Sequence, residues 1–218
     1  MQIKPAILPH NFNEITEKLA RIEGLVNHVQ IDLCDGIFGR EKTWLPDGTE
    51  KLPESFSYEF DIMMNDWRES MLHALSLGVV SIVAHVDLFE DGDMETLISI
   101  VSPHKANLGI AVSNDKTLEF HADMIRRAKS LYANVFIQVM GINQVGEQGQ
   151  LFDEESIGRV TTLKQQFGDM NLQVDGGMNL ETAKKIKDAG ADTIVVGSYI
   201  FGRDDAGASL EELNTATA

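Results

Sequence analysis

Short apolar runs alternate along the whole chain with longer segments in which apolar residues recur at helical spacing. Short apolar runs have the length of buried strands, and the longer segments have the period of amphipathic helices. The predicted strands span Ile3–Leu8, His28–Leu33, Tyr58–Met63, Ser81–His85, Asn107–Val112, Asn134–Val139, Asn171–Val174 and Thr193–Val196. Because strands that alternate with helices form a parallel sheet, we predict an α/β fold, namely a (β/α)8 or TIM barrel.

The segments between these strands carry helix start and stop signals. Predicted helices cover residues 11–24, 66–78, 93–101, 117–131, 154–168 and 179–190. Asn11, Asp66 and Asn179 are the predicted N-caps, and glycines such as Gly24 and Gly190 end their segments. Only residues 38–57, rich in Gly, Pro and charge, predict a long loop. No linker interrupts the pattern, so we expect one domain over residues 1–218.

Composition and charge narrow the classes of partner. The 218 residues are 43% apolar and 24% charged, as expected of a globular chain, and the formal net charge is −16. Clustered Lys and Arg for a nucleic-acid backbone are missing. We expect no membrane role, because no apolar run is long enough. The single cysteine, Cys34, and the absence of a signal-peptide pattern at the start predict a cytoplasmic protein.

In a barrel of this kind, residues at the C-terminal ends of the strands face the active site. Asp32, Asp61 and Asp175 each stand near the end of an apolar strand, where a carboxylate needs a ligand, a metal or a partner. The alternative role for one or two of the three, Asp61 above all, is a helix cap or an Asx turn. Two facing carboxylates would allow proton removal and return on opposite faces of one carbon, which is epimerisation. The same rule selects the pocket candidates His10, Met63, His85, Met140 and Gly141.

Two glycine-bearing turns after the seventh and eighth predicted strands suit a phosphate group. Gly176 and Gly177 belong to the first turn, and Gly197 and Ser198 belong to the second. Glycines let backbone N–H groups approach phosphate oxygens, and barrels often bind phosphate at these two positions. We therefore expect a phosphorylated small-molecule substrate held mainly by backbone groups. No sequence feature calls for an organic cofactor.

These residues together resemble the ribulose-phosphate 3-epimerase family. The match includes PAILPHNF, HVQIDLCDGIF, SIVAHVD, GQLF, VDGGMNLETAKKIKDAGAD and VVGSYIFG. The resemblance implies that Asp32 and Asp175 act as acid and base and that both bind a divalent metal, which stabilises an enediolate. It also places Met63 and Met140 where the family lines its pocket with methionines.

The chain departs from the family at four places. Gln30 and Asp61 occupy the positions of two histidine metal ligands, and Pro9 replaces a serine that contacts the substrate. The family's glycine-rich loop after strand six is replaced by GINQVGEQGQ. A site of Gln30, Asp32, Asp61 and Asp175 offers only oxygen ligands, which favours Mg²⁺ or Mn²⁺ over Zn²⁺ or Fe²⁺.

Three functions remain open at this point. The first is a sugar-phosphate epimerase, with His10 or His85 as an additional ligand or proton donor; otherwise His85 packs at the barrel rim and His10 lies on the surface. The second is a related barrel lyase, although its Asp-x-Lys-x-x-Asp array is missing. The third is a phosphate-binding barrel without catalysis, which binds a metabolite or a partner. Homo-oligomer formation is left open.

Overall fold

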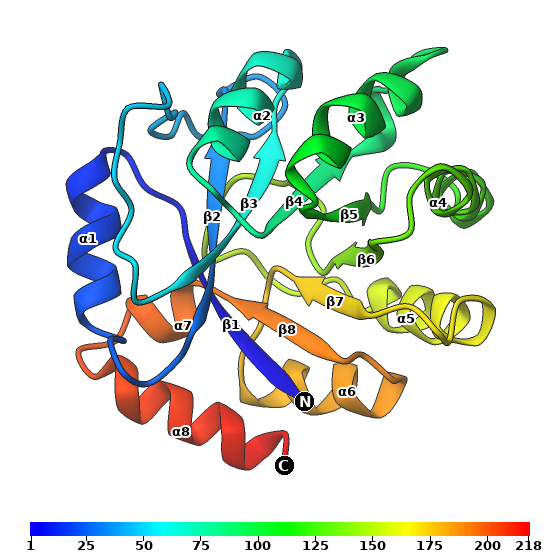
Figure 1. Cartoon of the computed structure of the whole chain (residues 1–218). Helices are drawn as coiled ribbons and strands as arrows, with labels where there is room; N and C mark the ends of the chain where they lie inside the picture. Colours follow the sequence, from blue (N-terminus) through cyan, green and yellow to red (C-terminus); the bar gives the residue numbers. More distant parts are fainter.

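The computed structural model describes residues 1–218 as a closed barrel of eight parallel strands surrounded by helices (Figure 1). Each strand pairs with the next along the chain, and the last pairs with the first. The predicted TIM-barrel fold is therefore confirmed. The strands are β1 (Gln2–Ile7), β2 (His28–Cys34), β3 (Ser57–Met63), β4 (Ser81–His85), β5 (Asn107–Val112), β6 (Val135–Met140), β7 (Leu172–Asp175) and β8 (Thr193–Val196).

Helices follow the strands on the outside of the barrel (Figure 1). They are α1 (Phe12–Ala20), α2 (Trp67–Ser76), α3 (Asp93–Val101), α4 (Leu118–Leu131), α5 (Glu155–Gln166), α6 (Leu180–Ala189), α7 (Ser198–Phe201) and α8 (Ala206–Ala216), with short 3₁₀ turns η1 (Val86–Leu88) and η2 (Ser102–His104). Asn179 begins α6 with a capping box, and Gly190 ends it at φ 103°. Both signals had been predicted correctly.

The structure corrects several local predictions. The first helix ends at Ala20, before Gly24, and Asp66 makes no side-chain capping bond at α2. The predicted helices did not include α7 and α8. Residues 141–154 form a second long segment without helix or strand, besides the predicted loop. This second segment follows β6 and reaches over the C-terminal end of the barrel.

The hydrophobic core lies mainly between the sheet and the helices. Its largest cluster has 50 buried residues, including Ile31, Phe60 and Ile137 from the outward faces of the strands. Inside the barrel, the buried apolar cluster of Val83, Ala111 and Phe136 is small. Much of the remaining barrel interior is polar, which is the feature that positions the site. No helix of the chain combines the length and the apolar character needed to cross a membrane.

Candidate active site

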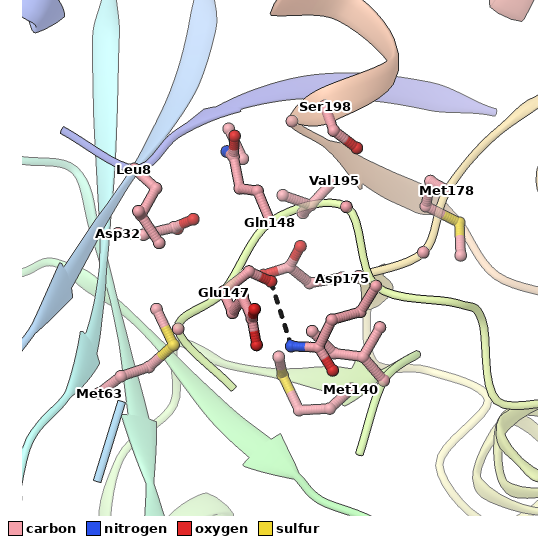
Figure 2. Close-up of a pocket in the computed structure, with 18 residues that line it drawn as sticks. Leu8, Asp32, Met63, Met140, Glu147, Gln148, Asp175, Met178, Val195 and Ser198 are labelled. Atoms are coloured by element: carbon pink, nitrogen blue, oxygen red, sulfur yellow. Dashed lines mark hydrogen bonds between the residues drawn. The ribbon is translucent and has the colours of Figure 1, made fainter. Parts of the chain in front are cut away.

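The C-terminal ends of the strands surround a cavity (Figure 2). Its empty space, including the part that opens to solvent, is about 510 Å³, of which about 50 Å³ is available to the centres of water-sized molecules. Asp32 and Asp175 lie on its wall, together with Met63 and Met140. No lysine or arginine lines the cavity. Any anionic ligand must therefore be held here by neutral hydrogen-bond donors.

A single amide links the two aspartates across the barrel. The Nε2 atom of Gln30 donates to Oδ1 of Asp32 and to Oδ2 of Asp175, each at 2.9 Å. Asp32 comes from β2 and Asp175 from β7, which are not neighbouring strands, so the two carboxylates approach the cavity from different sides. The Oε1 atom of Gln30 is buried and has no hydrogen-bond partner.

Asp61 lies near these two residues, but its environment is different. Its Oδ1 atom is 2.8 Å from Nε2 of His85, and its Oδ2 atom accepts a hydrogen bond of 2.6 Å from Gln138. Asp61 and His85 are both fully or almost fully buried. Asp61 thus serves neither as a helix cap nor in an Asx turn, the alternatives drawn from the sequence.

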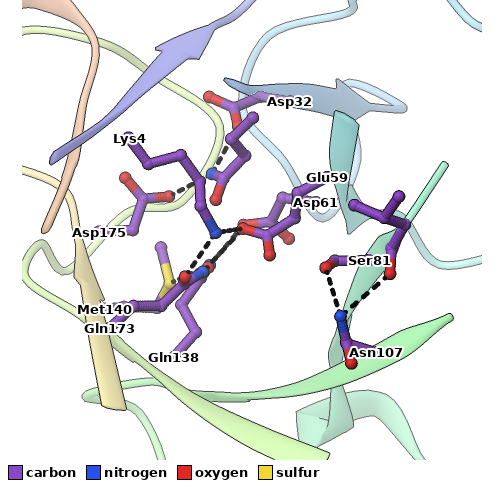
Figure 3. A network of polar contacts seen from close by, with 12 residues as sticks. Lys4, Asp32, Glu59, Asp61, Ser81, Asn107, Gln138, Met140, Gln173 and Asp175 are labelled. Atoms are coloured by element: carbon purple, nitrogen blue, oxygen red, sulfur yellow. Dashed lines mark hydrogen bonds and ion pairs between the residues drawn. The ribbon is translucent and has the colours of Figure 1, made fainter. Parts of the chain in front are cut away.

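A chain of hydrogen bonds continues from Asp61 toward the N-terminal end of the barrel (Figure 3). Gln138 Oε1 accepts from Gln173 Nε2, which also donates to Glu59 at 2.8 Å. Lys4 Nζ then donates to Glu59 and to Gln173, each at 2.8 Å. Gln138 and Gln173 lie on neighbouring strands, but the bonds to Glu59 and from Lys4 join strands that are not neighbours in the sheet, so they cross the barrel interior. Polar residues therefore extend from the cavity floor down to Lys4.

Burial and mutual repulsion change the protonation of the cavity carboxylates. Burial, followed by the charge of Asp175, raises the pKa of Asp32 well above its usual value. Burial, followed by the charge of Asp61, raises the pKa of Asp175 to about 7. For His85, burial alone would lower the pKa, but Asp61 outweighs burial and the pKa is raised. Near neutral pH, Asp32 therefore favours its protonated form, and Asp175 is close to the pH at which it titrates.

The three carboxylates of Asp32, Asp61 and Asp175 form a group that could hold a metal ion. One oxygen atom from each carboxylate lies within 4.8 Å of the other two, and all three residues are buried. Hard divalent cations prefer such oxygen ligands. The unpaired Oε1 atom of Gln30 is a fourth oxygen, and it would face the carboxylates if the amide turned by half a rotation. The residues therefore fit a divalent cation.

The glycine turns leave several backbone donors free at the cavity. The N–H groups of Gly176, Gly177, Met178 and Gly197 donate to no protein atom. Gly176 and Gly177 have φ values of 101° and 70°, which favour glycine. A Cβ atom on Gly177 would also lie 2.7 Å from the Cα atom of Phe152. Together with Ser198, which lines the same cavity, these residues can form an anion-binding turn.

The structure places the other predicted pocket residues differently. Met63 and Met140 line the cavity, whereas His85 is buried beneath it against Asp61. Gly141 does not line the cavity. It packs against the backbone of Gly176, since a Cβ atom on Gly141 would clash with the carbonyl oxygen of Gly176. His10 lies outside the cavity: its side chain is 56% exposed and is 3.5 Å from Glu41. The residues beyond β1 turn away toward α1, which carries His10 to the surface.

Sequence reasoning missed Gln138, Gln173, Glu59 and Lys4 in the barrel interior and Gln148 in the cavity. A signal for three of them existed. Glu59, Gln138 and Gln173 stand two positions before Asp61, Met140 and Asp175 on apolar strands, so each pair points to the same face. Gln148 lies in an irregular loop, and no periodic pattern could have selected it.

Comparisons with known proteins identify the family of the chain. The model of the family described as "Ribulose-phosphate 3 epimerase family" matches residues 2–201. The ribulose-phosphate 3-epimerase of Mycobacterium tuberculosis (strain H37Rv) is 25% identical over 226 residues, covering 97% of this chain and 90% of that protein. The Aquifex aeolicus ribulose-phosphate 3-epimerase is 25% identical over 220 residues, covering 98% and 95%.

Solved structures show the same fold at lower identity. A 3-hexulose-6-phosphate synthase superposes with a TM-score of 0.74 at 18% identity, covering 100% of both chains. The orotidine 5'-monophosphate decarboxylase of Sulfolobus solfataricus gives 0.67 at 16% identity, covering 99% of this chain and 97% of that one. Since the family model spans nearly the whole chain and the site residues stand on its strands, the chain belongs to the ribulose-phosphate 3-epimerase family.

Proposed function

We propose that the protein is a sugar-phosphate epimerase that inverts C3 of a ketose phosphate, with ribulose 5-phosphate and xylulose 5-phosphate as its substrate pair. The observation that carries this proposal is the pair of cavity carboxylates, Asp32 and Asp175, which come from different strands and are linked by the amide of Gln30. Family membership supports the reaction class.

Asp32 and Asp175 are the proposed proton carriers. The ionised carboxylate removes the C3 proton from one face of the substrate, and the electron pair of the broken C–H bond forms an enediolate with C2. The protonated carboxyl group then delivers its proton to C3 from the other face. After one turnover the two residues have exchanged roles, and the reverse reaction uses the same path. The raised pKa of both groups supports a shared proton near neutral pH.

The proposed metal ligands are Asp32, Asp61, Asp175 and Gln30, and the proposed ion is Mg²⁺ or Mn²⁺. A bound divalent cation would act as a Lewis acid on the enediolate oxygens. The buried oxygen set supports a hard cation over Zn²⁺ or Fe²⁺. His85 holds Asp61 in place through its 2.8 Å contact and so orients the third carboxylate.

The proposed phosphate site consists of Gly176, Gly177, Gly197 and Ser198. Their free backbone N–H groups support this role, and the absence of cationic side chains from the cavity makes backbone capture necessary. Met63 and Met140 supply apolar walls next to the aspartates. A phosphate at this end would orient the sugar so that C3 lies between the carboxylates.

The test is NMR-monitored exchange of the C3 hydrogen of ribulose 5-phosphate in D₂O, with added Mg²⁺, Mn²⁺ or Zn²⁺. Exchange with formation of xylulose 5-phosphate, lost in Asp32→Asn and in Asp175→Asn, is the expected result. Asp123→Asn, an exposed carboxylate paired with Arg126 on α4, is the matched control and should keep full activity. Phosphate binding without exchange under any metal would instead favour a non-catalytic barrel. In favour of that alternative, both oxygens of Asp61 already accept hydrogen bonds.

A further inference from the structure

Two buried polar atoms at the end of β4 have no hydrogen-bond partner in the protein. They are Nδ1 of His85, the last residue of the strand, and Oδ2 of Asp87, in the turn η1 that follows the strand. Buried polar groups in folded proteins almost always have a partner. Since the two residues are only two positions apart, one small molecule can serve both atoms.

Hydrogen bonds fix the side chain of Asp87 and favour its ionised form. Its Oδ1 atom accepts a bond of 2.6 Å from Oγ of Ser113 and lies 3.2 Å from Nε2 of His121. His121 is fully buried, and its Nδ1 atom lies 3.1 Å from the carbonyl oxygen of Thr117 at the start of α4. Burial would raise the pKa of Asp87, but the hydrogen bonds from His121 and Ser113 lower it. The unpaired Oδ2 atom therefore belongs to a charged group, which makes the lack of a donor costly.

The ring of His85 is fixed as well. Its Nε2 atom is 2.8 Å from Oδ1 of Asp61, and its edge contacts the ring of Phe38 at a centroid distance of 5.3 Å. His85 is among the groups that lower the pKa of Asp87, so the two side chains lie within electrostatic range of each other. Because Nε2 is directed at Asp61, Nδ1 is the only ring nitrogen that is available to Asp87.

A water molecule suits these two atoms. They make no direct hydrogen bond with each other, and a bridging water joins polar groups that are too far apart for one. The water can donate to the carboxylate oxygen and can donate to or accept from the ring nitrogen, according to the tautomer. A hard cation would find only one carboxylate oxygen in this pair, which is too few ligands.

We propose that Asp87 is a positioning residue, which holds the imidazole of His85 against Asp61 through one buried water molecule between Oδ2 of Asp87 and Nδ1 of His85. A hydrogen-bonded series then runs from the start of α4 through His121, Asp87 and His85 to Asp61. Its effect on cation binding rests on the proposed function, in which Asp61 is a metal ligand. A residue outside the cavity thereby determines the direction of the third carboxylate.

The test is Mn²⁺ binding by the full chain, measured from the electron paramagnetic resonance signal of the free ion. Asp87→Asn keeps the shape of the side chain and removes its charge, and it should weaken Mn²⁺ binding about tenfold, as the loss of an outer partner of a metal ligand usually does. Ser113→Ala removes one bond that holds Asp87 and should weaken binding by a smaller factor. Asp93→Asn is the matched control: Asp93 is a buried carboxylate that pairs with Arg68 outside the cavity, so Mn²⁺ affinity should not change.

A double-variant cycle shows whether Asp87 acts through His85. His85→Gln keeps an amide donor for Asp61 but removes the Nδ1 atom, so Asp87→Asn added to it should not weaken Mn²⁺ binding further. Mn²⁺ affinity that is unaltered in Asp87→Asn would overturn the inference. A tenfold loss on adding Asp87→Asn to His85→Gln would overturn it too.

Urea unfolding separates this inference from the proposed function. If the unchanged protein binds no Mn²⁺, the proposed metal centre is lost, but the water bridge can still be measured because it does not depend on a metal. The double variant Asp87→Asn/His85→Gln should then lose less unfolding free energy than the sum of the losses in the two single variants. Additive losses would remove the bridge and the inference with it.

Discussion

The two ends of the barrel interior contain similar residues, glutamines and carboxylates. They differ in whether the polar atoms have hydrogen-bond partners. At the N-terminal end, the polar atoms of Lys4, Glu59 and Gln173 bond to one another, and none of them is buried without a partner. Toward the C-terminal end, Oε1 of Gln30, Nδ1 of His85 and Nε2 of Gln148 are buried and unpaired.

This difference favours a structural role for the polar residues at the N-terminal end and the proposed ligand-binding role for those toward the C-terminal end. A buried polar group without a partner costs about 1–3 kcal/mol, so a protein keeps such groups mainly where a ligand or a water completes them. The lower network is complete without any ligand, which is the property of a structural element. The upper group keeps unpaired atoms that a cation, a phosphate or a substrate oxygen can complete.

Removing either cavity carboxylate, Asp32 or Asp175, should abolish activity without destabilising the fold. In Asp32→Asn and in Asp175→Asn, the C3 exchange rate should fall about 10²- to 10⁴-fold, which is the usual contribution of a general acid or base. At pH 8 the free energy of unfolding should be unchanged in Asp32→Asn, because burial and Asp175 favour the neutral form of Asp32. It should be higher in Asp175→Asn, because a repelling charge is gone. Exchange kinetics and urea unfolding of the same samples measure both effects. An active Asp175→Asn variant would remove the proposed mechanism.

Removing the charge of Lys4, at the N-terminal end of the barrel interior, should have the opposite result. Lys4→Met leaves the Glu59 carboxylate buried without its partner, and breaking a buried ion pair costs about 3–5 kcal/mol of unfolding free energy. Urea unfolding at pH 7 measures the loss, and the double variant Lys4→Met/Glu59→Leu should restore a large part of it. If Lys4→Met instead lost C3 exchange while keeping its stability, the lower network would belong to the active site.

The sequence was sufficient to predict the barrel because its signals are local and repeated. Apolar runs predicted β4, β5 and β8 with the bounds found in the structure, and the Asn179 and Gly190 caps bounded α6. Bounds were less accurate where a polar residue ends a strand, as Asp175 does in β7. The helix α8 was missed, although Asp205 caps it through a 2.9 Å bond to the N–H group of Ala208.

The site was predictable only as far as strand ends determine it. The position rule for barrels selected Asp32 and Asp175, and the structure brings both to the cavity. The rule also selected His10, because spacing along the chain does not show that the backbone turns away after β1. The contact between Gln30 and Asp175 joins residues 145 positions apart, and Gln148 depends on loop pairing. Such contacts arise from tertiary packing and leave no periodic pattern in the sequence.

The comparison also predicts a pH dependence of stability. Burial and the charge of Asp61 raise the pKa of Asp175 in the folded protein to about 7, above its ordinary value of 3.8, so the native state keeps a proton that the unfolded chain releases. This contribution to stability is fully present below about pH 4 and is lost as pH rises through about 7. The loss can reach about 4 kcal/mol, since one pKa unit corresponds to about 1.4 kcal/mol.

Between pH 4.5 and pH 8, the free energy of unfolding should fall more in the unchanged protein than in Asp175→Asn. Asp87 supplies a control of opposite sign. Burial would raise its pKa, but hydrogen bonds from His121 and Ser113 lower it, so its contribution appears above about pH 4. An Asp175→Asn variant with the same pH slope as the unchanged protein would contradict the assignment of the shared proton.

A divalent cation bound by Asp32, Asp61 and Asp175 should relieve the repulsion between these carboxylates and stabilise the fold. Mg²⁺ or Mn²⁺ at about 100 times its Kd should raise the unfolding free energy by about 2.7 kcal/mol. The effect should be larger at pH 8 than at pH 5.5, because protons compete with the cation for Asp32 and Asp175. Thermal unfolding with and without each metal measures this, and Asp61→Asn should weaken it. Gln30→His combined with Asp61→His should shift the preference toward Zn²⁺, since imidazole ligands suit that ion.

If no cation stabilises the protein at pH 8, Gln30 itself must complete the upper group. Its Nε2–H₂ group already bridges Asp32 and Asp175 at 2.9 Å, and this neutral donor would then take the position of the cation between the two carboxylates. Gln30→Glu would distinguish the two cases. With a cation, an added carboxylate should strengthen metal binding and retain stability. Without one, it should add a fourth repelling charge to Asp32, Asp61 and Asp175 and destabilise the fold at pH 8.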